Sequence, residues 1–217
     1  MKVKICANRN IYDAQSCIEA KADIIGILVG QEHNSNDFVN KETAKEISDY
    51  VGDKCDISLV THLKNAYEII ELTKYIGNNM IQLHSDIDEG EVEKIRNQLP
   101  EVKLVRLIHI SEKGEIYTDI NKIKYADYYL LDSFNLKTNQ VGGTGLTHDW
   151  NKSNEIIKKL DKPTFLAGGL NPENVAQAIL IVKPYGVDVN SGCKNEKGIK
   201  DRNKVIEFVK NAKEKLI

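Results

Sequence analysis

The sequence is poor in the features that mark several classes of protein. Its 217 residues include only four cysteines, four prolines and one tryptophan, and the net charge is -2. No two cysteines stand in a C-x-x-C pair, which argues against a zinc site and against a thioredoxin-type redox motif. No apolar run approaches the ~18 residues that cross a bilayer. No dense basic block favours nucleic acid or an anionic membrane as a partner.

These shortages lead to several expectations about the surroundings of the protein. Met1 and Lys2 run directly into an apolar segment, so we expect no signal peptide. Cysteines without a pairing pattern favour a reduced, cytoplasmic protein. Because no group of histidines, cysteines and carboxylates has metal-ligand spacing, we predict no metal and no cofactor, and neither a nucleic-acid nor a membrane partner.

What the sequence does contain is a regular alternation of short apolar runs and amphipathic segments. The alternation repeats roughly every 25 to 30 residues, which is typical of βα units on a parallel sheet. Several runs lack polar alternation, as expected for strands buried on both faces. The predicted strands cover residues 3–6, 23–29, 56–61, 80–84, 103–108, 128–132, 164–167 and 186–190. Eight strands, about eight helices and no linker favour an α/β protein with one (βα)8 TIM-barrel domain over residues 1–217.

Four helix starts can be predicted from capping patterns. One helix is expected over residues 13–18, and Asn40 has the character of an N-cap for the next. Asn171-Pro172 has the order that favours Asn as N-cap and Pro as first helical residue. The last helix is expected over residues 201–216.

Two titratable side chains end predicted strands, Cys6 the first and Asp132 the sixth. In a TIM barrel both would lie on the rim where such enzymes do their chemistry. A thiol facing a carboxylic acid favours a base and an acid that act on one proton, and therefore an enzyme. A lone cysteine is more often a small packing residue, which is what we expect of the other three. A carboxylate that ends an apolar strand is costly unless it is solvated or paired.

Three glycine-bearing stretches follow the last three strands, at residues 142–145, 167–170 and 190–192. Glycines allow backbone N–H groups to approach an anion closely. In barrels, the loops after the seventh and eighth strands commonly bind phosphate. One such stretch could equally serve a turn or a helix cap, but two at the ends of consecutive strands predict a phosphate site. His84 ends the fourth strand, where a substrate ligand and a hydrogen-bonded structural histidine both remain open.

These segments, in this order, resemble the phosphoribosylanthranilate isomerase family. The resemblance extends over essentially the whole chain and is strongest from Asp132 onward. The matching segments are Lys4-Ile5-Cys6, Asp13-Ala14, Gln82-Leu83-His84, Leu131-Asp132, Gly142-Gly143-Thr144-Gly145, Asp149-Trp150, residues 166–175 and residues 185–192.

The resemblance implies a TIM barrel that carries out a cofactor-free Amadori rearrangement in tryptophan biosynthesis. N-(5-phosphoribosyl)anthranilate would become 1-(2-carboxyphenylamino)-1-deoxyribulose 5-phosphate. By position, Cys6 would be the general base and Asp132 the general acid, and the partner would be a small phosphorylated sugar. Family members occur as monomers and homodimers, so either state is expected. The implied substrate-binding and phosphate-binding residues are His84, Gly142, Gly143, Gly168, Gly169, Asp188, Ser191 and Gly192.

The sequence departs from the family pattern mainly where the aromatic amine would bind. Asp37 stands where the family has an arginine that binds the anthranilate carboxylate, which exchanges a cation for an anion. The other departures are Ala7 for glycine, Thr61 and His62 at an apolar strand end, and His148 for phenylalanine.

Two interpretations of Asp37 remain open at this point. Another cation, such as Arg9 or Arg106, could bind the carboxylate, or the enzyme could act on a different phosphoribosyl amine. A lyase or aldolase on a related sugar phosphate is a further alternative, although no lysine convincingly ends a strand to form a Schiff base. A sensor that keeps the phosphate site without catalysis is the non-enzymatic alternative.

Overall fold

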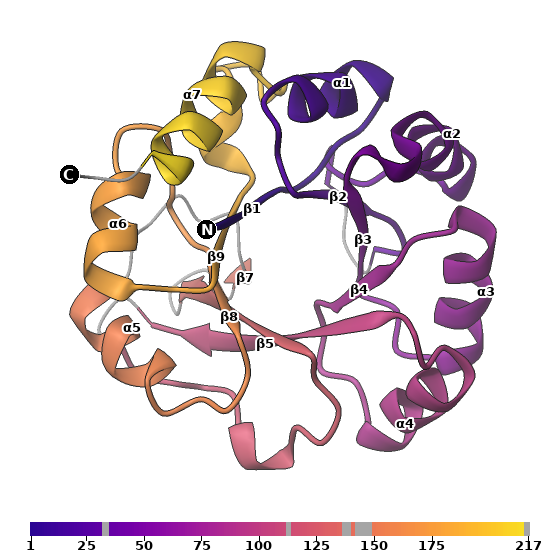
Figure 1. The fold of residues 1–217 in the computed structure, drawn as a ribbon. Coiled ribbons are helices and arrows are strands. Elements are labelled where there is room, and N and C mark those ends of the chain that lie inside the picture. The colour runs from indigo at the N-terminus through magenta and orange to yellow at the C-terminus, as the bar shows by residue number, and fades with distance from the viewer. Residues whose placement is uncertain (32–34, 112–113, 136–139, 142–148, 215–217) are drawn as a thin grey trace.

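Eight parallel strands close into a barrel in the computed structural model, which describes residues 1–31, 35–111, 114–135, 140–141 and 149–214. Each strand pairs with the next, β6 lies between β5 and β8, and β9 returns to β1 (Figure 1). The strands are β1 (Lys2–Ile5), β2 (Ile24–Leu28), β3 (Asp56–Thr61), β4 (Met80–Leu83), β5 (Lys103–Ile110), β6 (Tyr128–Asn135), β8 (Thr164–Leu166) and β9 (Gly186–Val189). A short strand, β7 (Gln140–Val141), pairs antiparallel with the end of β6. The TIM-barrel prediction is therefore confirmed.

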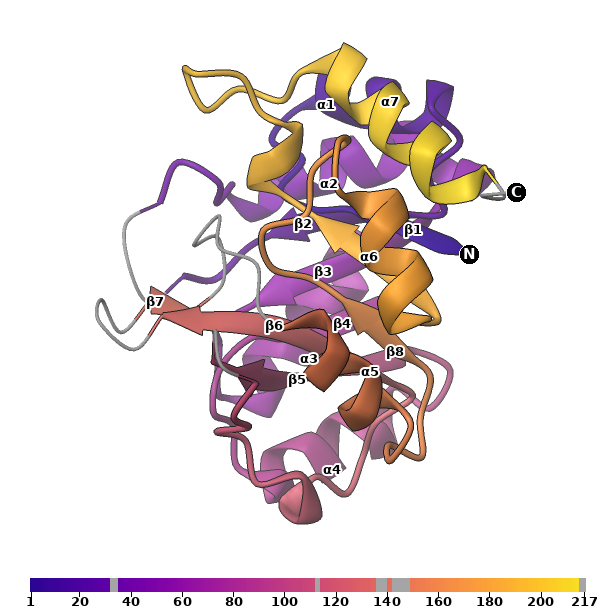
Figure 2. The same ribbon diagram turned by 90° about the vertical axis from the view of Figure 1, so that its left-hand side faces the viewer.

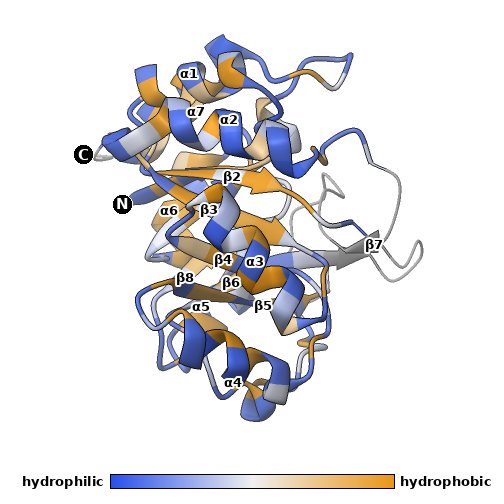
Figure 3. Cartoon of the chain, turned by 90° about the vertical axis from the view of Figure 1, so that its right-hand side faces the viewer, coloured by the Kyte–Doolittle hydropathy of each residue, from blue (hydrophilic) through white to orange (hydrophobic). Residues whose placement is uncertain are grey.

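Helices cover the outside of the barrel, with polar residues outward and apolar residues toward the strands (Figures 1 and 3). They are α1 (Ile11–Glu19), α2 (Lys41–Val51), α3 (Ala66–Ile76), α4 (Glu89–Gln98), α5 (Trp150–Ile157), α6 (Val175–Val182) and α7 (Arg202–Lys213), with 3-10 turns η1 (Gly52–Lys54), η2 (Ile120–Lys122) and η3 (Ser191–Cys193). Between β5 and β6 the described residues hold only η2, so the expected eighth helix is absent from them. Within the same described ranges, no helix is long and apolar enough to span a bilayer.

The predicted strands lie close to the observed ones, and two of the four helix starts are confirmed. The side chains of Asn40 and Asp201 accept hydrogen bonds from the first turns of α2 and α7. The helix expected from residue 13 begins at Ile11, because Asn10 caps it and accepts from the Asp13 amide at 2.9 Å.

The prediction at Asn171-Pro172 is wrong by one turn. The side chains of Asn171 and Asn174 each accept a hydrogen bond from the other's backbone N–H, both at 2.9 Å. This exchange holds residues 171–174 as a separate turn, and the helix proper, α6, begins only at Val175.

The strand register decides which side chains point into the barrel. Lys4 lies opposite Ile24 on one side and Asp188 on the other, so these three share the inner face. An apolar layer fills the interior, made of Ile24, Met80, Val105, Leu107, Leu130, Phe165 and Ala167. Because Cys6 and Asp132 follow Lys4 and Leu130 by two residues, they also face inward, at the carboxyl ends of the strands. In Figure 2 this end of the barrel is on the left, where β6 and β7 extend.

Candidate active site

A buried ion pair lies at the centre of the carboxyl end of the barrel. Lys4 Nζ of β1 lies 2.7 Å from Asp188 Oδ2 of β9, and their side chains are only 3% and 6% exposed. Burial would lower the pKa of Lys4, but the facing carboxylate of Asp188 and the Cys6 sulfur together raise it above its usual value. The lysine is therefore a fixed cation, and its pairing with Asp188 compensates both buried charges.

Cys6 follows the strand that carries Lys4 and is 8% exposed. Gly26 on the neighbouring strand leaves room for it, since a methyl group at that position would lie 3.0 Å from Cys6 Sγ and 3.3 Å from Lys4 Cε. Burial raises the pKa of the Cys6 thiol, while the ammonium groups of Lys4 and Lys200 oppose that rise and Asp188 adds to it. Lys200 Nζ donates to the carbonyl oxygen of Cys6.

The residue after Cys6 explains one departure from the expected pattern. Ala7 adopts φ 60°, the left-handed region that glycine enters at little cost and alanine enters with strain. The backbone therefore keeps the conformation that a glycine would supply, and Cys6 stays at the carboxyl end of β1.

Asp132 faces the same space from β6 and is 6% exposed. Burial, reinforced by the nearby charge of Asp188, raises the pKa of Asp132 to about 7, although the Ser133 amide that donates to it at 2.8 Å and the Lys4 ammonium act in the opposite direction. A carboxyl with a pKa near 7 can hold a proton at neutral pH and release it, which is what a general acid requires. Asp188 and Lys4 act on both Cys6 and Asp132, so these two groups share one electrostatic environment.

The two glycine loops predicted to bind phosphate lie against each other. A methyl group on Gly192 would lie 1.9 Å from the carbonyl oxygen of Leu170, so only glycine permits this approach. Gly168 and Gly169 adopt φ values of 85° and 64°. The structure therefore brings residues 168–170 and 191–192 together. Gly142, Gly143 and His148 lie outside the described residues.

A row of rings borders the opposite side of the rim. The ring centroids of Phe38 and His62 are 5.3 Å apart, and those of His62 and His84 are 5.4 Å apart. Gln82 Nε2 lies 3.0 Å from Nδ1 of His84. The row joins the ends of β3 and β4 to the loop after β2, and its flat rings could stack with an aromatic group.

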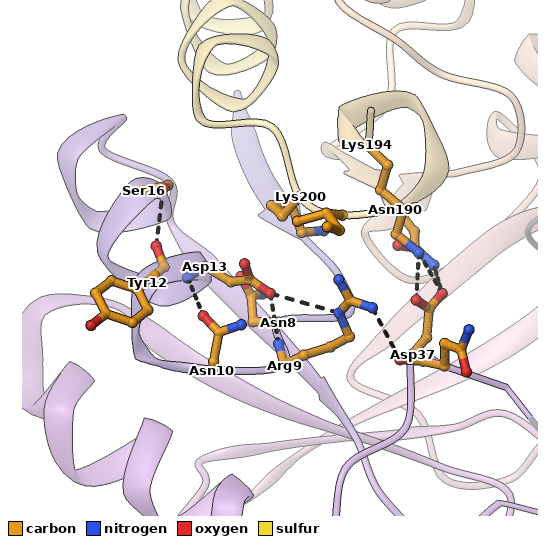
Figure 4. Close-up of polar contacts among 12 residues, drawn as sticks. Asn8, Arg9, Asn10, Tyr12, Asp13, Ser16, Asp37, Asn190, Lys194 and Lys200 are labelled. Atoms are coloured by element: carbon orange, nitrogen blue, oxygen red, sulfur yellow. Dashed lines mark hydrogen bonds and ion pairs between the residues drawn. The ribbon is translucent and has the colours of Figure 1, made fainter. Parts of the chain in front are cut away.

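Asp37 belongs to a separate polar cluster on the rim. Both of its oxygens accept from Lys194 Nζ, the longer contact at 2.6 Å, and Asn190 Nδ2 donates to it at 2.8 Å (Figure 4). Burial would raise the pKa of Asp37, but Lys194 and Asn190 hold it below its usual value. The carboxylate is therefore ionised and paired.

Arg9 and Arg106, the two cations that could replace the family's carboxylate-binding arginine, lie on different faces of the barrel. Arg106 faces outward from β5 and pairs with Glu89 at 2.5 Å, away from the interior. Arg9 lies on the rim, where Nη1 is 3.4 Å from the carbonyl oxygen of Asn36. The structure thus removes Arg106 from the candidates and keeps Arg9.

Sequence reasoning missed several residues of this rim. Lys4 could have been found, because a lysine two residues before Cys6 in an apolar strand shares its face. Lys194 and Lys200 lie in an exposed-looking polar segment and carried no such signal. His109 lies opposite Asp132 in the register, and burial lowers its pKa, which favours the neutral ring. In the described part of the chain no group of three or more histidines, cysteines or carboxylates could hold a metal ion.

The fold and the rim together define a class of protein. The parallel barrel buries a thiol at its carboxyl end, together with a carboxyl group whose pKa is about 7, beside two adjoining glycine loops. This is the layout of a TIM-barrel enzyme that works by acid–base chemistry.

Comparison with known proteins identifies the family. The family model described as N-(5'-phosphoribosyl)anthranilate isomerase matches residues 3–211. The protein named N-(5'-phosphoribosyl)anthranilate isomerase 2 of Methanosarcina mazei is 40% identical, over 98% of this chain and 94% of its own. The chain belongs to the N-(5'-phosphoribosyl)anthranilate isomerase family.

Solved structures agree with this assignment. The phosphoribosylanthranilate isomerase of Thermotoga maritima matches with a TM-score of 0.83 and 28% identity, over 98% of both chains. Another structure of the family, in complex with reduced 1-(o-carboxyphenylamino)-1-deoxyribulose 5-phosphate, matches with a TM-score of 0.77 and 27% identity, over 98% of both chains. The Thermotoga maritima enzyme is described as dimeric.

Proposed function

We propose that this chain converts N-(5-phosphoribosyl)anthranilate into 1-(2-carboxyphenylamino)-1-deoxyribulose 5-phosphate, a step of tryptophan biosynthesis, with Asp132 as general acid and Cys6 as general base. The activity is that of the family to which the chain belongs. The observation that carries the residue roles is the buried Asp132, whose pKa is raised to about 7 beside the Lys4–Asp188 pair that also faces Cys6.

The proposed steps balance in atoms and charge. Asp132 gives its proton to the furanose ring oxygen as the C1–O bond breaks, and the amine nitrogen supplies the electron pair that forms the C1=N iminium. Cys6 Sγ removes the C2 proton, and the electrons of that C–H bond form C1=C2 while the iminium nitrogen becomes neutral. The resulting enol becomes the C2 ketone as its hydroxyl loses a proton and C1 gains one. Transfer of a proton from Cys6 to Asp132 through solvent then restores both groups. This is an aldose–ketose isomerisation without net oxidation.

The charges around Cys6 support its role as base. Burial alone would keep the thiol protonated, and a thiolate is the species that accepts the proton. Lys4 and Lys200 supply positive potential at the sulfur, and the cationic iminium would add to it during the reaction. These positive charges oppose the rise that burial and Asp188 impose on the pKa of Cys6, and so act in the direction of deprotonation.

The remaining predicted contacts are supported by the shape and polarity of the rim. Gly168, Gly169, Ser191 and Gly192 are proposed to hold the phosphate, since their loops adjoin and glycines let backbone N–H groups approach an anion closely. Among the described residues, Oδ1 of Asp188 has no hydrogen-bond partner, which suits an acceptor for a sugar hydroxyl. His84 is proposed to border the sugar. The monomer or homodimer state and the cytoplasmic location stay predictions.

An aldolase that acts through a Schiff base is not favoured. Lys4 faces the barrel interior beside Cys6, but its pairing with Asp188 raises its pKa above the usual value. A Schiff-base lysine requires the opposite shift, because it must be neutral to attack a carbonyl carbon.

The test is turnover of phosphoribosylanthranilate generated in situ, followed by loss of the anthranilate-type fluorescence. Cys6→Ser and Asp132→Asn should each lower kcat by about 10²–10⁴-fold, the usual contribution of general acid–base catalysis. Calorimetric binding of the reduced product should change little, because neither substitution touches the phosphate loops.

Cys55→Ser is the matched control, since Cys55 is a half-buried thiol that precedes β3 at the opposite end of the barrel. It should keep the wild-type rate. Full activity in both Cys6→Ser and Asp132→Asn would refute the assigned roles.

A further inference from the structure

The aromatic amine of the proposed substrate carries a carboxylate, and the rim needs a cation or hydrogen-bond donors to bind it. This inference rests on the proposed function and concerns how the same site recognises the aminobenzoate group. Asp37 lies on the part of the rim next to the ring row of Phe38 and His62. A free carboxylate there would repel the substrate, so the state of Asp37 matters first.

Asp37 is fully engaged by groups from the far end of the chain. Lys194 and Asn190 both donate to it, and they follow β9 (Figure 4). The ion pair cancels the charge at position 37 and ties the loop after β2 to the segment after the glycine loop at Ser191 and Gly192. Asp37 therefore acts on the shape of the rim through Lys194.

Arg9 lies on the adjoining loop, three residues after Cys6, and its side chain extends toward residues 36–37 (Figure 4). Its described contacts are long, at 3.4 Å to the carbonyl oxygen of Asn36 and 4.0 Å from Nε to Asp13 Oδ2. A guanidinium has five N–H donors in a planar fork that matches a carboxylate. Most of these donors are left for another acceptor.

The other nearby cations have closer partners. Lys4 is paired with Asp188, Lys194 with Asp37, and buried Lys200 donates to the Cys6 carbonyl. Among the described residues, the charged group that includes Arg9 has three cations and two anions, and its net positive charge favours an incoming anion. The group is Arg9, Lys194 and Lys200 against Asp13 and Asp37.

We propose that Arg9 binds the carboxylate of the aminobenzoate group, and that Asp37 is a positioning residue that holds Lys194 and the loop after β9. The cation has moved from the loop after β2 to the loop after β1, and position 37 has taken the opposite charge. Specificity for a carboxylated amine is thereby kept in spite of Asp37.

The test compares two substrates that differ only in the carboxylate, namely the phosphoribosyl adducts of anthranilate and of aniline. Arg9→Ala should lower kcat/KM for the anthranilate adduct by about 10–100-fold, the value of a charge-assisted hydrogen bond, mainly through KM. The aniline adduct should be turned over by Arg9→Ala and wild type alike. Arg9→Lys should recover part of the loss, because it restores the charge without the fork.

Two further variants act as controls. Arg202→Ala removes an exposed arginine that pairs with Glu19 on the outside of α7, and it should change neither substrate. Asp37→Ala should keep the preference for the anthranilate adduct. The proposal is overturned if Arg9→Ala affects both adducts equally, affects neither, or if Asp37→Ala abolishes the preference.

Calorimetry with the reduced product measures the same contact without turnover. Wild-type protein that turned over neither adduct would refute the proposed reaction. Weaker binding of the reduced product by Arg9→Ala, with Arg202→Ala unchanged, would still support the role of Arg9 in that case, and equal binding by both would overturn it.

Discussion

Asp132 shows how one position can serve catalysis at the expense of stability. The side chain ends an apolar strand, and burial together with the charge of Asp188 raises its pKa to about 7. The folded protein therefore holds a proton that the unfolded chain has already lost at neutral pH, where an ordinary aspartate is ionised. Keeping the acid protonated therefore lowers the free energy of unfolding at neutral pH.

This cost gives a pH prediction. Because the folded pKa is raised, the contribution of Asp132 to stability is full below pH ~4 and is lost as the pH rises through about 7. The unfolding free energy of wild type minus that of Asp132→Asn should fall by as much as about 4 kcal/mol between pH 4 and 8. Urea unfolding at each pH measures it.

Asp53→Asn, which changes an exposed carboxyl of η1, is the control and should show no comparable trend. Subtraction of the Asp132→Asn curve from the wild-type curve removes the contribution of paired carboxylates such as Asp23 and Asp127. The pKa values of these two groups are lowered, so they change stability with pH in the opposite direction. A difference between wild type and Asp132→Asn that is constant with pH would contradict the assigned state of Asp132.

At the scale of residues, strand ends were predictable and partnerships were not. Cys6 and Asp132 were found because a titratable group after an apolar run is locally unusual. The partners of Lys4 and Asp37 lie 184 and 157 residues away. Such partners come together only when the barrel closes, and a local pattern in a single sequence does not indicate which distant residues will pair.

At the scale of elements, β2 shapes the site without contributing a reactive group. Gly26 lies beside Cys6 and the end of the Lys4 side chain, and it leaves the space that these side chains occupy. Its strand neighbour in the register is Ser58 of β3, which is fully buried. The absence of a side chain at Gly26 therefore helps to set the position of the Cys6 sulfur.

Gly26→Ala should lower kcat by about 10²-fold, the scale expected of a misplaced catalytic group, with little change in KM. The new methyl group would lie 3.0 Å from Cys6 Sγ and must displace it. Steady-state kinetics measures the effect, and thermal unfolding checks that the fold is kept. Ser58→Ala is the control, since it removes one atom from the register neighbour of Gly26. Equal kcat in Gly26→Ala and wild type would refute the packing argument.

The elements themselves were largely predictable because parallel strands in a barrel are short, apolar and regularly spaced. Two connections differ from the expectation. The exchange between Asn171 and Asn174 delays α6, and the connection from β5 to β6 contains η2 where a helix was expected. Such local hydrogen bonds compete with the helix and leave little trace in periodicity.

At the scale of the whole molecule, the barrel is closed where β9 meets β1, and the Lys4–Asp188 pair crosses that seam. On the outside, Arg202 of α7 pairs with Glu19 of α1 over the same seam. Closure of the barrel at this seam therefore also brings Asp188 beside Lys4 and Cys6.

The buried pair should affect stability and catalysis differently. Lys4→Met leaves Asp188 buried without a counter-charge and should cost about 3–5 kcal/mol of unfolding free energy. The double variant Lys4→Met with Asp188→Leu should regain most of that stability, because both charges are gone, yet stay nearly inactive. Urea unfolding and turnover measure the two effects.

The surface pair Lys74–Glu71 supplies the control. Lys74→Met should cost less than about 1 kcal/mol, as exposed pairs do. If Lys4→Met were no more costly than Lys74→Met, or if the double variant were fully active, the pair would have neither of the roles assigned to it.

The pairing of β1 with β9 also has a consequence for translation. Lys4 and Asp188 are 184 residues apart, so at about 5–20 residues per second the ribosome adds the second roughly 10–40 s after the first. During that interval the nascent chain carries Cys6 with neither the last strand nor the counter-charge in place. A polypeptide released before β9 is complete therefore lacks the Asp188 carboxylate that pairs with Lys4. We expect such a fragment to be inactive, so that catalytic activity requires synthesis of the last strand.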